Sequence, residues 1–158
     1  MEASLLSKYL KVLLIEDDAA TRDILSFFLK ELGVTDVTEF SNAVEALQYV
    51  KMNPHWRGVV ICDWNMPKMS GAAFYREIKR MYPDIPFIMV TGRNDEDSVH
   101  FAKDHGVYAY LLKPVALEEL ARKVSRVADE HSRFLALPVP HDMKAEDKEN
   151  ANANVYSI

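Results

Sequence analysis

The chain has 158 residues, of which 49% are hydrophobic and 27% charged, and its formal net charge is -5 at pH 7. This balance fits one ordinary globular domain and leaves no room for a second domain of similar size. The acidic balance argues against direct binding to nucleic acid, because such binding depends on clustered Lys and Arg. No signal peptide or bilayer-length apolar run is evident, so we expect a cytoplasmic protein without membrane association.

Five short segments have the composition of β-strands. Four are nearly continuous apolar runs, whereas the second in chain order is weaker. They cover residues 12–15, 37–40, 59–62, 87–90 and 108–112. Continuous rather than alternating apolar residues indicate strands that are buried on both faces, as in a parallel sheet. The single cysteine, Cys62, lies in the third run, and we expect it to pack as a small buried hydrophobic residue.

The segments between these strands have helical spacing. In the first segment one stripe is apolar, formed by Ile24, Leu25, Phe28, Leu29 and Leu32. Gly33 is placed to end this helix as its C′ residue, and Gly106 is placed to close the fourth helix. The later helices are predicted to begin at residues 41–42, near 71, within the acidic stretch 94–97 and after 114. The last of them continues to about residue 131.

Five alternating strand and helix units predict an α/β fold: a doubly wound parallel sheet with helices on both faces, giving three layers. We divide the chain into an N-terminal extension (1–9), the folded domain (10–131) and a flexible C-terminal tail (132–158). The tail assignment depends on the polar stretch 144–154, which cannot bury enough apolar area to offset the entropy lost on ordering.

Acidic and polar residues stand where the predicted strands end. They are Glu16, Asp17 and Asp18 after the first strand, Asp63 after the third, Thr91 after the fourth and Lys113 after the fifth. Parallel strands bring such residues to one edge of the sheet. Carboxylates from two neighbouring strands form an oxygen-rich site that suits Mg2+. The sequence therefore predicts a magnesium site beyond the carboxyl ends of the strands.

Asp63 has the chemistry of a phosphoryl acceptor at this edge. A carboxylate can attack phosphorus and form an acyl phosphate. The metal and Lys113 would offset the charge on the transferred group. The Thr91 hydroxyl can donate to a phosphoryl oxygen, and Gly92 beside it leaves space for the donor.

Four short motifs together resemble the bacterial two-component response regulator receiver family, in particular its stand-alone, chemotaxis-regulator-like members. They are residues 15–18, residues 63–67 with Gly71, residues 90–92 and residues 110–114. The resemblance spans about residues 10–131. It implies a flavodoxin-like strand order, 2-1-3-4-5. Many members carry two aspartates where this chain has Glu16 and Asp17, so Glu16 is a departure from the usual pair, though a tolerated one.

The resemblance also implies roles for the site residues. Asp17 would bind the metal directly and Glu16 mainly through water, while Asp63 would be both metal ligand and phosphoacceptor. The backbone carbonyl of Asn65 would be the third protein ligand. On phosphorylation Lys113 and Thr91 would each contact a phosphoryl oxygen. A further implied change is that Tyr110 swings inward, and Asn65 and Arg93 would tune the lifetime of the acyl phosphate.

Several of these residues also have a purely structural interpretation. Asp18 sits where the first helix needs an N-cap, and we favour that role over metal binding. Lys113 could be a solvated charge and Tyr110 a half-buried sheet residue, although we favour the functional role for both. We expect Trp64 to be partly exposed on the loop after Asp63. The five histidines lack the spacing of metal ligands.

The predicted function is a single-domain response regulator. Its phosphoryl donor would be a histidine kinase or a histidine phosphotransfer protein, and its last two strand–helix units would bind an unidentified downstream protein. The alternatives are a phosphotransfer intermediate or phosphate sink, and a scaffold that docks without phosphorylation. Enzymatic activity would be limited to self-phosphorylation from small donors and hydrolysis of its own acyl phosphate. The sequence is compatible with a monomer and with a phosphorylation-dependent dimer.

Overall fold

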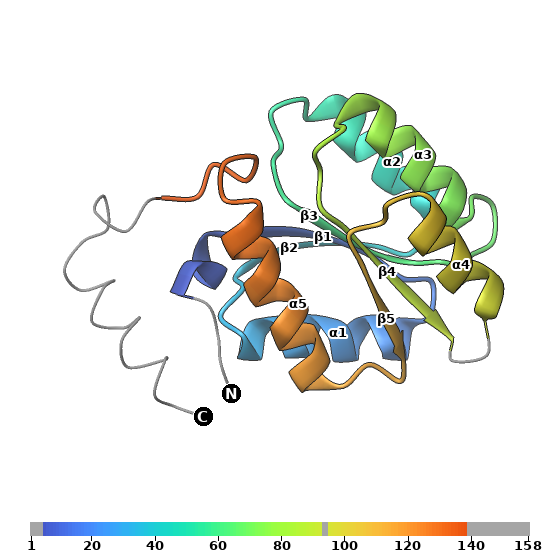
Figure 1. Cartoon of the computed structure of the whole chain (residues 1–158), viewed down its shortest axis with the longest axis horizontal. Helices are drawn as coiled ribbons and strands as arrows, with labels where there is room; N and C mark the ends of the chain where they lie inside the picture. Colours follow the sequence, from blue (N-terminus) through green and yellow to red (C-terminus); the bar gives the residue numbers. More distant parts are fainter. Residues whose placement is uncertain (1–4, 93–94, 139–158) are drawn as a thin grey trace.

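The computed structural model describes residues 5–92 and 95–138, which form a five-stranded parallel sheet between two layers of helices (Figure 1). The strands are β1 (Lys11–Ile15), β2 (Asp36–Phe40), β3 (Val59–Asp63), β4 (Phe87–Gly92) and β5 (Ala109–Lys113). Their order across the sheet is β2-β1-β3-β4-β5, and every neighbouring pair is parallel. This arrangement confirms the predicted fold class and strand order.

In the described residues, five α-helices and one short 3-10 helix surround the sheet. They are η1 (Leu5–Tyr9), α1 (Ala19–Glu31), α2 (Ala43–Met52), α3 (Gly71–Met81), α4 (Glu96–Asp104) and α5 (Leu117–Glu130). Helices α1 and α5 cover one face of the sheet, and α2, α3 and α4 cover the other (Figure 1). None of the helices in the described part of the chain is both long enough and apolar enough to span a membrane.

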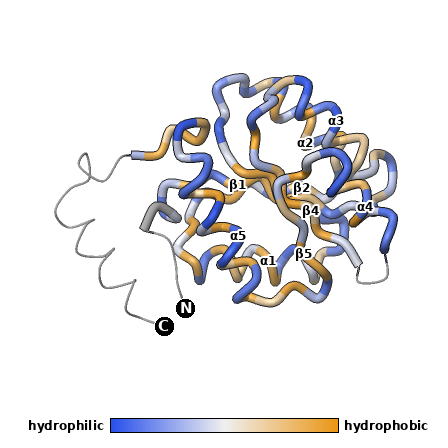
Figure 2. The backbone as a smooth tube through the Cα atoms, in the orientation of Figure 1, coloured by the Kyte–Doolittle hydropathy of each residue, from blue (hydrophilic) through white to orange (hydrophobic). Residues whose placement is uncertain are grey.

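The core forms because the central strands are apolar on both sides. β3 is buried along its whole length, and β1 is buried except at Lys11. The hydrophobic stretches gather on the strands and on the helix faces turned toward them (Figure 2). Cys62 is fully buried in the layer under α2 and α3, as predicted. β2 is the half-exposed edge strand, which explains its weaker apolar pattern.

Local capping fixes where the helices begin and end. The N-cap side chains that accept a hydrogen bond from the backbone N–H three residues on are Asp18, Asn42, Ser70 and Asp95. Such caps satisfy one of the amides that a helix start leaves without a partner. Gly33 and Gly106 have φ values of 87° and 68°, the left-handed conformation that favours glycine after a helix end. Both predicted C′ glycines are therefore confirmed.

The packed part of the chain extends past residue 131, where the predicted domain ends. Leu135 and Leu137 are 6% and 8% exposed and belong to the core under α1 and α5. Phe134 contacts both halves of the core. At the other end of the chain η1, inside the predicted extension, contacts α5. Apolar residues within 132–137 bury enough area to order this segment, whereas residues 139–158 of the predicted tail lie outside the described residues.

A chain that ends at residue 131 should be less stable than one that ends at residue 138. Burial of two leucine side chains stabilises a fold by about 3 kcal/mol before the cost of ordering the segment, so we expect a loss of about 2 kcal/mol. Urea unfolding followed by circular dichroism measures this difference. Equal free energies of unfolding for the two chains would show that residues 132–137 contribute nothing to the fold.

Candidate functional site

Three carboxylates converge beyond the carboxyl ends of β1 and β3. Glu16 and Asp17 follow β1, and Asp63 is the last residue of β3. One carboxylate oxygen from each of the three lies within 4.8 Å of the others. Glu16 is 1% exposed and Asp63 is 5% exposed, whereas Asp17 faces solvent. The predicted convergence on one edge of the sheet is therefore present, with two of the three acids buried.

Backbone contacts hold these residues in place. The amide of Glu16 donates to the Phe40 carbonyl at 3.1 Å, which extends the β1–β2 pairing past the end of the strand. Arg22 donates through Nη1 to the Glu16 carbonyl at 2.8 Å. On the other side, Gly71 donates to the Trp64 carbonyl at 2.8 Å. A Cβ at Gly71 would lie 2.6 Å from the Asp63 carbonyl oxygen, so glycine is required where α3 begins.

Asp18 takes no part in this acidic group. Its Oδ2 atom accepts from the Thr21 amide at 2.8 Å and from the Thr21 hydroxyl at 2.6 Å. These bonds hold the pKa of Asp18 below its usual value. The side chain serves as the N-cap of α1, which confirms the structural interpretation over metal binding.

Lys113, the last residue of β5, supplies the positive charge of the site. Its Nζ atom lies 2.7 Å from Oε1 of Glu16 and 3.3 Å from Oδ1 of Asp63. Partial burial by itself lowers the pKa of Lys113, but contact with the two carboxylates outweighs it and the pKa is raised. Lys113 therefore stays protonated while bridging β1 and β3.

One ammonium group does not balance the acidic charge. Burial, followed by the neighbouring Glu16 carboxylate, raises the pKa of Asp63 to about 8, although Lys113 pulls in the opposite direction. The second oxygen of Glu16, Oε2, is buried and accepts no hydrogen bond within the described residues. The site thus has a surplus of negative charge and an unused buried oxygen.

Mg2+ fits this donor set. It prefers oxygen ligands, retains several waters and needs few protein carboxylates. The exposed Asp17 and the buried Asp63 would hold it, and the unused Oε2 of Glu16 suits contact through a metal-bound water. The bound cation would supply charge neutralisation at the Asp63 carboxylate. The side chain of Asn65, whose backbone carbonyl is the predicted third ligand, donates from Nδ2 to Oδ2 of Asp95 at 2.7 Å.

Thr91 near the end of β4 is fully buried and is bonded to α4. Its Oγ1 atom lies 2.7 Å from Oγ of Ser98 and 3.3 Å from Oδ2 of Asp95. The hydrogen bond from Asn65, with those from Ser98 and Thr91, holds the pKa of Asp95 below its usual value. The sequence analysis missed these roles of Asp95 and Ser98. The one available signal was the acidic start of the α4 helix.

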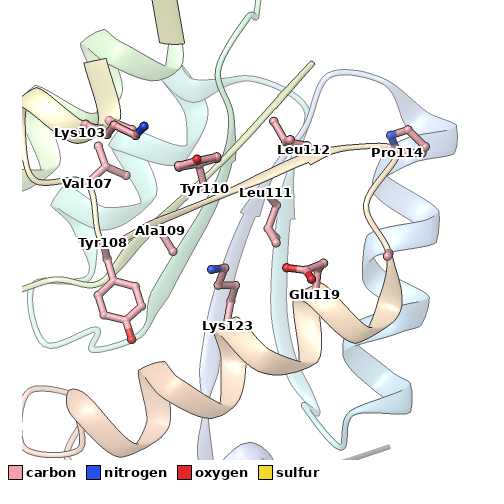
Figure 3. A pocket seen from close by; sticks show the side chains of 12 residues that line it. Lys103, Val107, Tyr108, Ala109, Tyr110, Leu111, Leu112, Pro114, Glu119 and Lys123 are labelled. Atoms are coloured by element: carbon pink, nitrogen blue, oxygen red, sulfur yellow. The ribbon is translucent and has the colours of Figure 1, made fainter. Parts of the chain in front are cut away.

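Tyr110 lies in the middle of β5 and is half-buried against the core on the α4 side. It lines a groove of about 530 Å³ that α4, β5 and α5 form. Figure 3 shows Tyr110 on the strand between Lys103 and the α5 side chains of Glu119 and Lys123. A rotation of the Tyr110 ring would therefore change the floor of this groove.

Trp64 is buried rather than partly exposed, which corrects the sequence prediction. Only 6% of it is exposed, and its ring centroid is 4.9 Å from that of Phe101 in α4. The physical reason is that the Trp64 amide donates to the Val90 carbonyl at 2.9 Å. The β3–β4 pairing thus continues through Trp64, so its side chain lies under α4.

Comparisons with known proteins agree with this geometry. A model of the response regulator receiver domain matches residues 12–125. A chemotaxis protein CheY homolog of Campylobacter jejuni is 34% identical over 120 residues, which are 75% of this chain and 92% of that protein. A response regulator receiver domain protein from Clostridium thermocellum has a crystal structure with a TM-score of 0.72 and 32% identity, covering 78% of this chain and 97% of that one.

A longer relative matches through part of its length. The C4-dicarboxylate transport transcriptional regulatory protein DctD of Rhizobium meliloti is 36% identical over 124 residues, which are 78% of this chain. This chain spans about a quarter of that relative, 26% of its length. The similarity therefore covers one region of DctD and does not extend to the activity of the whole protein.

Asp63→Asn should stabilise the protein at neutral pH in the absence of divalent metal. Ionised Asp63 is disfavoured in the fold, so the wild type loses stability as the pH rises from 3.8 toward about 8. The neutral amide avoids this loss, and we expect a gain of about 1–3 kcal/mol near pH 8. Urea unfolding of both proteins with EDTA at pH 5, 7 and 8 measures it. Parallel pH profiles for the two proteins would contradict the buried charge at Asp63.

Proposed function

The chain belongs to the response regulator receiver family of two-component systems, and on that premise we propose that it is a switch operated by phosphorylation of Asp63. The observation that carries the proposal is the buried Asp63 carboxylate with Glu16, Asp17 and Lys113 around it. Receiver domains interact with histidine kinases or phosphotransfer proteins and with downstream targets. A phosphohistidine donor of this kind is what we propose for this chain, acting in the cytoplasm.

The transfer step follows from the chemistry of the acceptor. An oxygen of Asp63 attacks the phosphorus of phosphohistidine, a P–O bond forms, and the P–N bond breaks with its electron pair left on the imidazole. Glu16, Asp17 and Asp63 would hold Mg2+, and the bound ion would lower the charge repulsion between donor and acceptor. The Lys113 ammonium lies 3.3 Å from Oδ1 of Asp63, so a phosphoryl oxygen on that carboxylate comes within its reach.

The proposed response to phosphorylation involves Thr91 and Tyr110. Thr91 donates its hydroxyl proton to a phosphoryl oxygen, and Tyr110 turns inward toward the space that Thr91 leaves. These residues lie on the adjacent strands β4 and β5, where Met89 pairs with Tyr110 and Thr91 with Leu112. A downstream protein then binds at the α4–β5–α5 groove, whose floor includes Tyr110.

We propose no turnover of a separate substrate. The chemistry available to the described site is phosphoryl uptake from small donors and hydrolysis of the resulting acyl phosphate. Two other functions are compatible with the same site chemistry: a phosphotransfer intermediate or phosphate sink, and a docking scaffold. Rapid return of the phosphoryl group to a histidine phosphotransfer protein would favour the first. Partner binding that Asp63→Asn leaves unchanged would favour the second.

Intact-mass analysis after incubation with acetyl phosphate tests the proposed function. We expect the wild type to gain one phosphoryl group in the presence of Mg2+ and none in EDTA, because the charge at Asp63 must be offset before attack. Asp63→Asn should gain none under either condition. Asp23→Asn, at an exposed position of α1, serves as the matched control and should gain one. Equal labelling of wild type and Asp63→Asn would place the acceptor elsewhere.

A further inference from the structure

The first turn of α4 holds the hydroxyl of Thr91. Oγ1 of Thr91 lies 2.7 Å from Oγ of Ser98 and 3.3 Å from Oδ2 of Asp95. Oγ of Ser98 also lies 3.0 Å from the Asp95 carbonyl oxygen. Thr91 and Ser98 are both buried, so water does not compete readily for these bonds.

The hydroxyl proton of Thr91 is used in a hydrogen bond to the first turn of α4. Each hydroxyl has one proton to donate. When Ser98 donates to the Asp95 carbonyl, Thr91 donates to Ser98; when Ser98 donates to Thr91, the acceptor left for Thr91 is the Asp95 carboxylate. In both arrangements the Thr91 proton points toward α4. Thr91 cannot donate it to a phosphoryl oxygen on Asp63 without breaking a bond to Ser98 or Asp95.

The Asp95 carboxylate connects three parts of the site. Its Oδ2 atom accepts from Nδ2 of Asn65, in the loop after β3, at 2.7 Å and from Thr91 at the end of β4. Its Oδ1 atom accepts from the Ser98 amide at 3.1 Å as the N-cap of α4. One side chain thus ties the loop that follows the acceptor, the switch hydroxyl and the start of α4 to one another.

We propose that Asp95 and Ser98 form a latch that holds Thr91 and α4 in the resting arrangement, and that a phosphoryl group on Asp63 opens this latch by taking the Thr91 proton. The inference rests on the proposed function, because it takes Asp63 as the acceptor. Asp95 and Ser98 are positioning residues that act through Thr91. Opening the latch removes the contact between Thr91 and the first turn of α4, so the helix that borders the proposed partner groove loses one of its attachments to β4.

The hydrogen bonds of the latch oppose the binding of a phosphoryl group, because they must break when it binds. A ligand shifts a two-state equilibrium by its differential affinity, and the resting state here is stabilised by bonds that the filled state must break. Removing one net hydrogen bond from the resting state should therefore tighten binding of a phosphoryl mimic about 3- to 10-fold. A purely structural role for Asp95 or Ser98 predicts the opposite, because loss of the α4 start would weaken binding or leave it unchanged.

Asp95→Asn is the sharpest variant, because it separates the latch from the helix cap. The amide oxygen can still accept from the Ser98 amide, and Asn is a good N-cap residue. The amide nitrogen replaces Oδ2 and cannot accept from Asn65 or Thr91. Ser98→Ala removes the other partner of Thr91. Asp97→Asn makes the same charge change at an exposed position of the same turn and serves as the control.

The experiment is a titration of each protein with beryllofluoride, a phosphoryl mimic, at saturating Mg2+, followed by tryptophan fluorescence. Trp64 contacts Phe101 of α4 and lies directly after Asp63, so its emission responds to filling of the site. The other tryptophan, Trp56, precedes β3 at the opposite end of that strand. Urea unfolding of the same variants establishes that each is folded under the conditions of the titration.

The inference predicts a lower apparent Kd for Asp95→Asn and Ser98→Ala, by about 3- to 10-fold, with Asp97→Asn equal to the wild type. Values within twofold of the wild type for both latch variants would overturn it. So would equal tightening by Asp97→Asn, because that result would assign the effect to net charge. Absence of binding by the wild type would overturn the proposed function and this inference with it.

Discussion

Two buried carboxylates that share one ammonium group form the constraint on which the rest of the site depends. Glu16 and Asp63 are removed from water by neighbouring strands, and Lys113 alone lies close enough to both to offset their charge in the described structure. Burial of charge without full compensation is unfavourable. The pKa of Asp63, raised to about 8, expresses this imbalance. A divalent cation would offset the remaining negative charge, so the feature that we expect to destabilise the metal-free fold would favour metal binding and the proposed phosphorylation.

The sheet also connects the buried charges to helix α4. Asp63 and Thr91 lie at the ends of adjacent strands, β3 and β4, where Asp63 pairs with Val90. Thr91 is in turn bonded to α4, and Trp64 packs on Phe101 of the same helix. Asp63 and α4 are therefore linked by short contacts through Thr91 and Trp64. The groove beside Tyr110 is also lined by α4 residues, so a movement of this helix would change the surface at which we propose that a partner binds.

Much of this architecture was predictable from sequence because it depends on local patterns. Continuous apolar runs predicted buried parallel strands, and the polar residues at their ends predicted where Asp63 and Lys113 meet. The burial of Trp64 was not predictable, since it results from continued pairing between β3 and β4 past the last strand residue. The latch was missed for a similar reason: Asp95 is one residue of an acidic stretch in the sequence, and the fold alone brings Asn65, 30 residues away, to its side. Leu135 and Leu137 stood too close to a polar segment to be recognised as core.

Proton release on magnesium binding tests the central claim most directly. If Asp63 carries a proton at pH 7 because its pKa is about 8, binding of Mg2+ must displace that proton. Calorimetric titrations in two buffers of different ionisation enthalpy measure the number of protons released. The account predicts about one proton per Mg2+ at pH 7, falling toward zero above pH 9, and no such release from Asp63→Asn. Tight binding of Mg2+ without proton release from the wild type at pH 7 would contradict it.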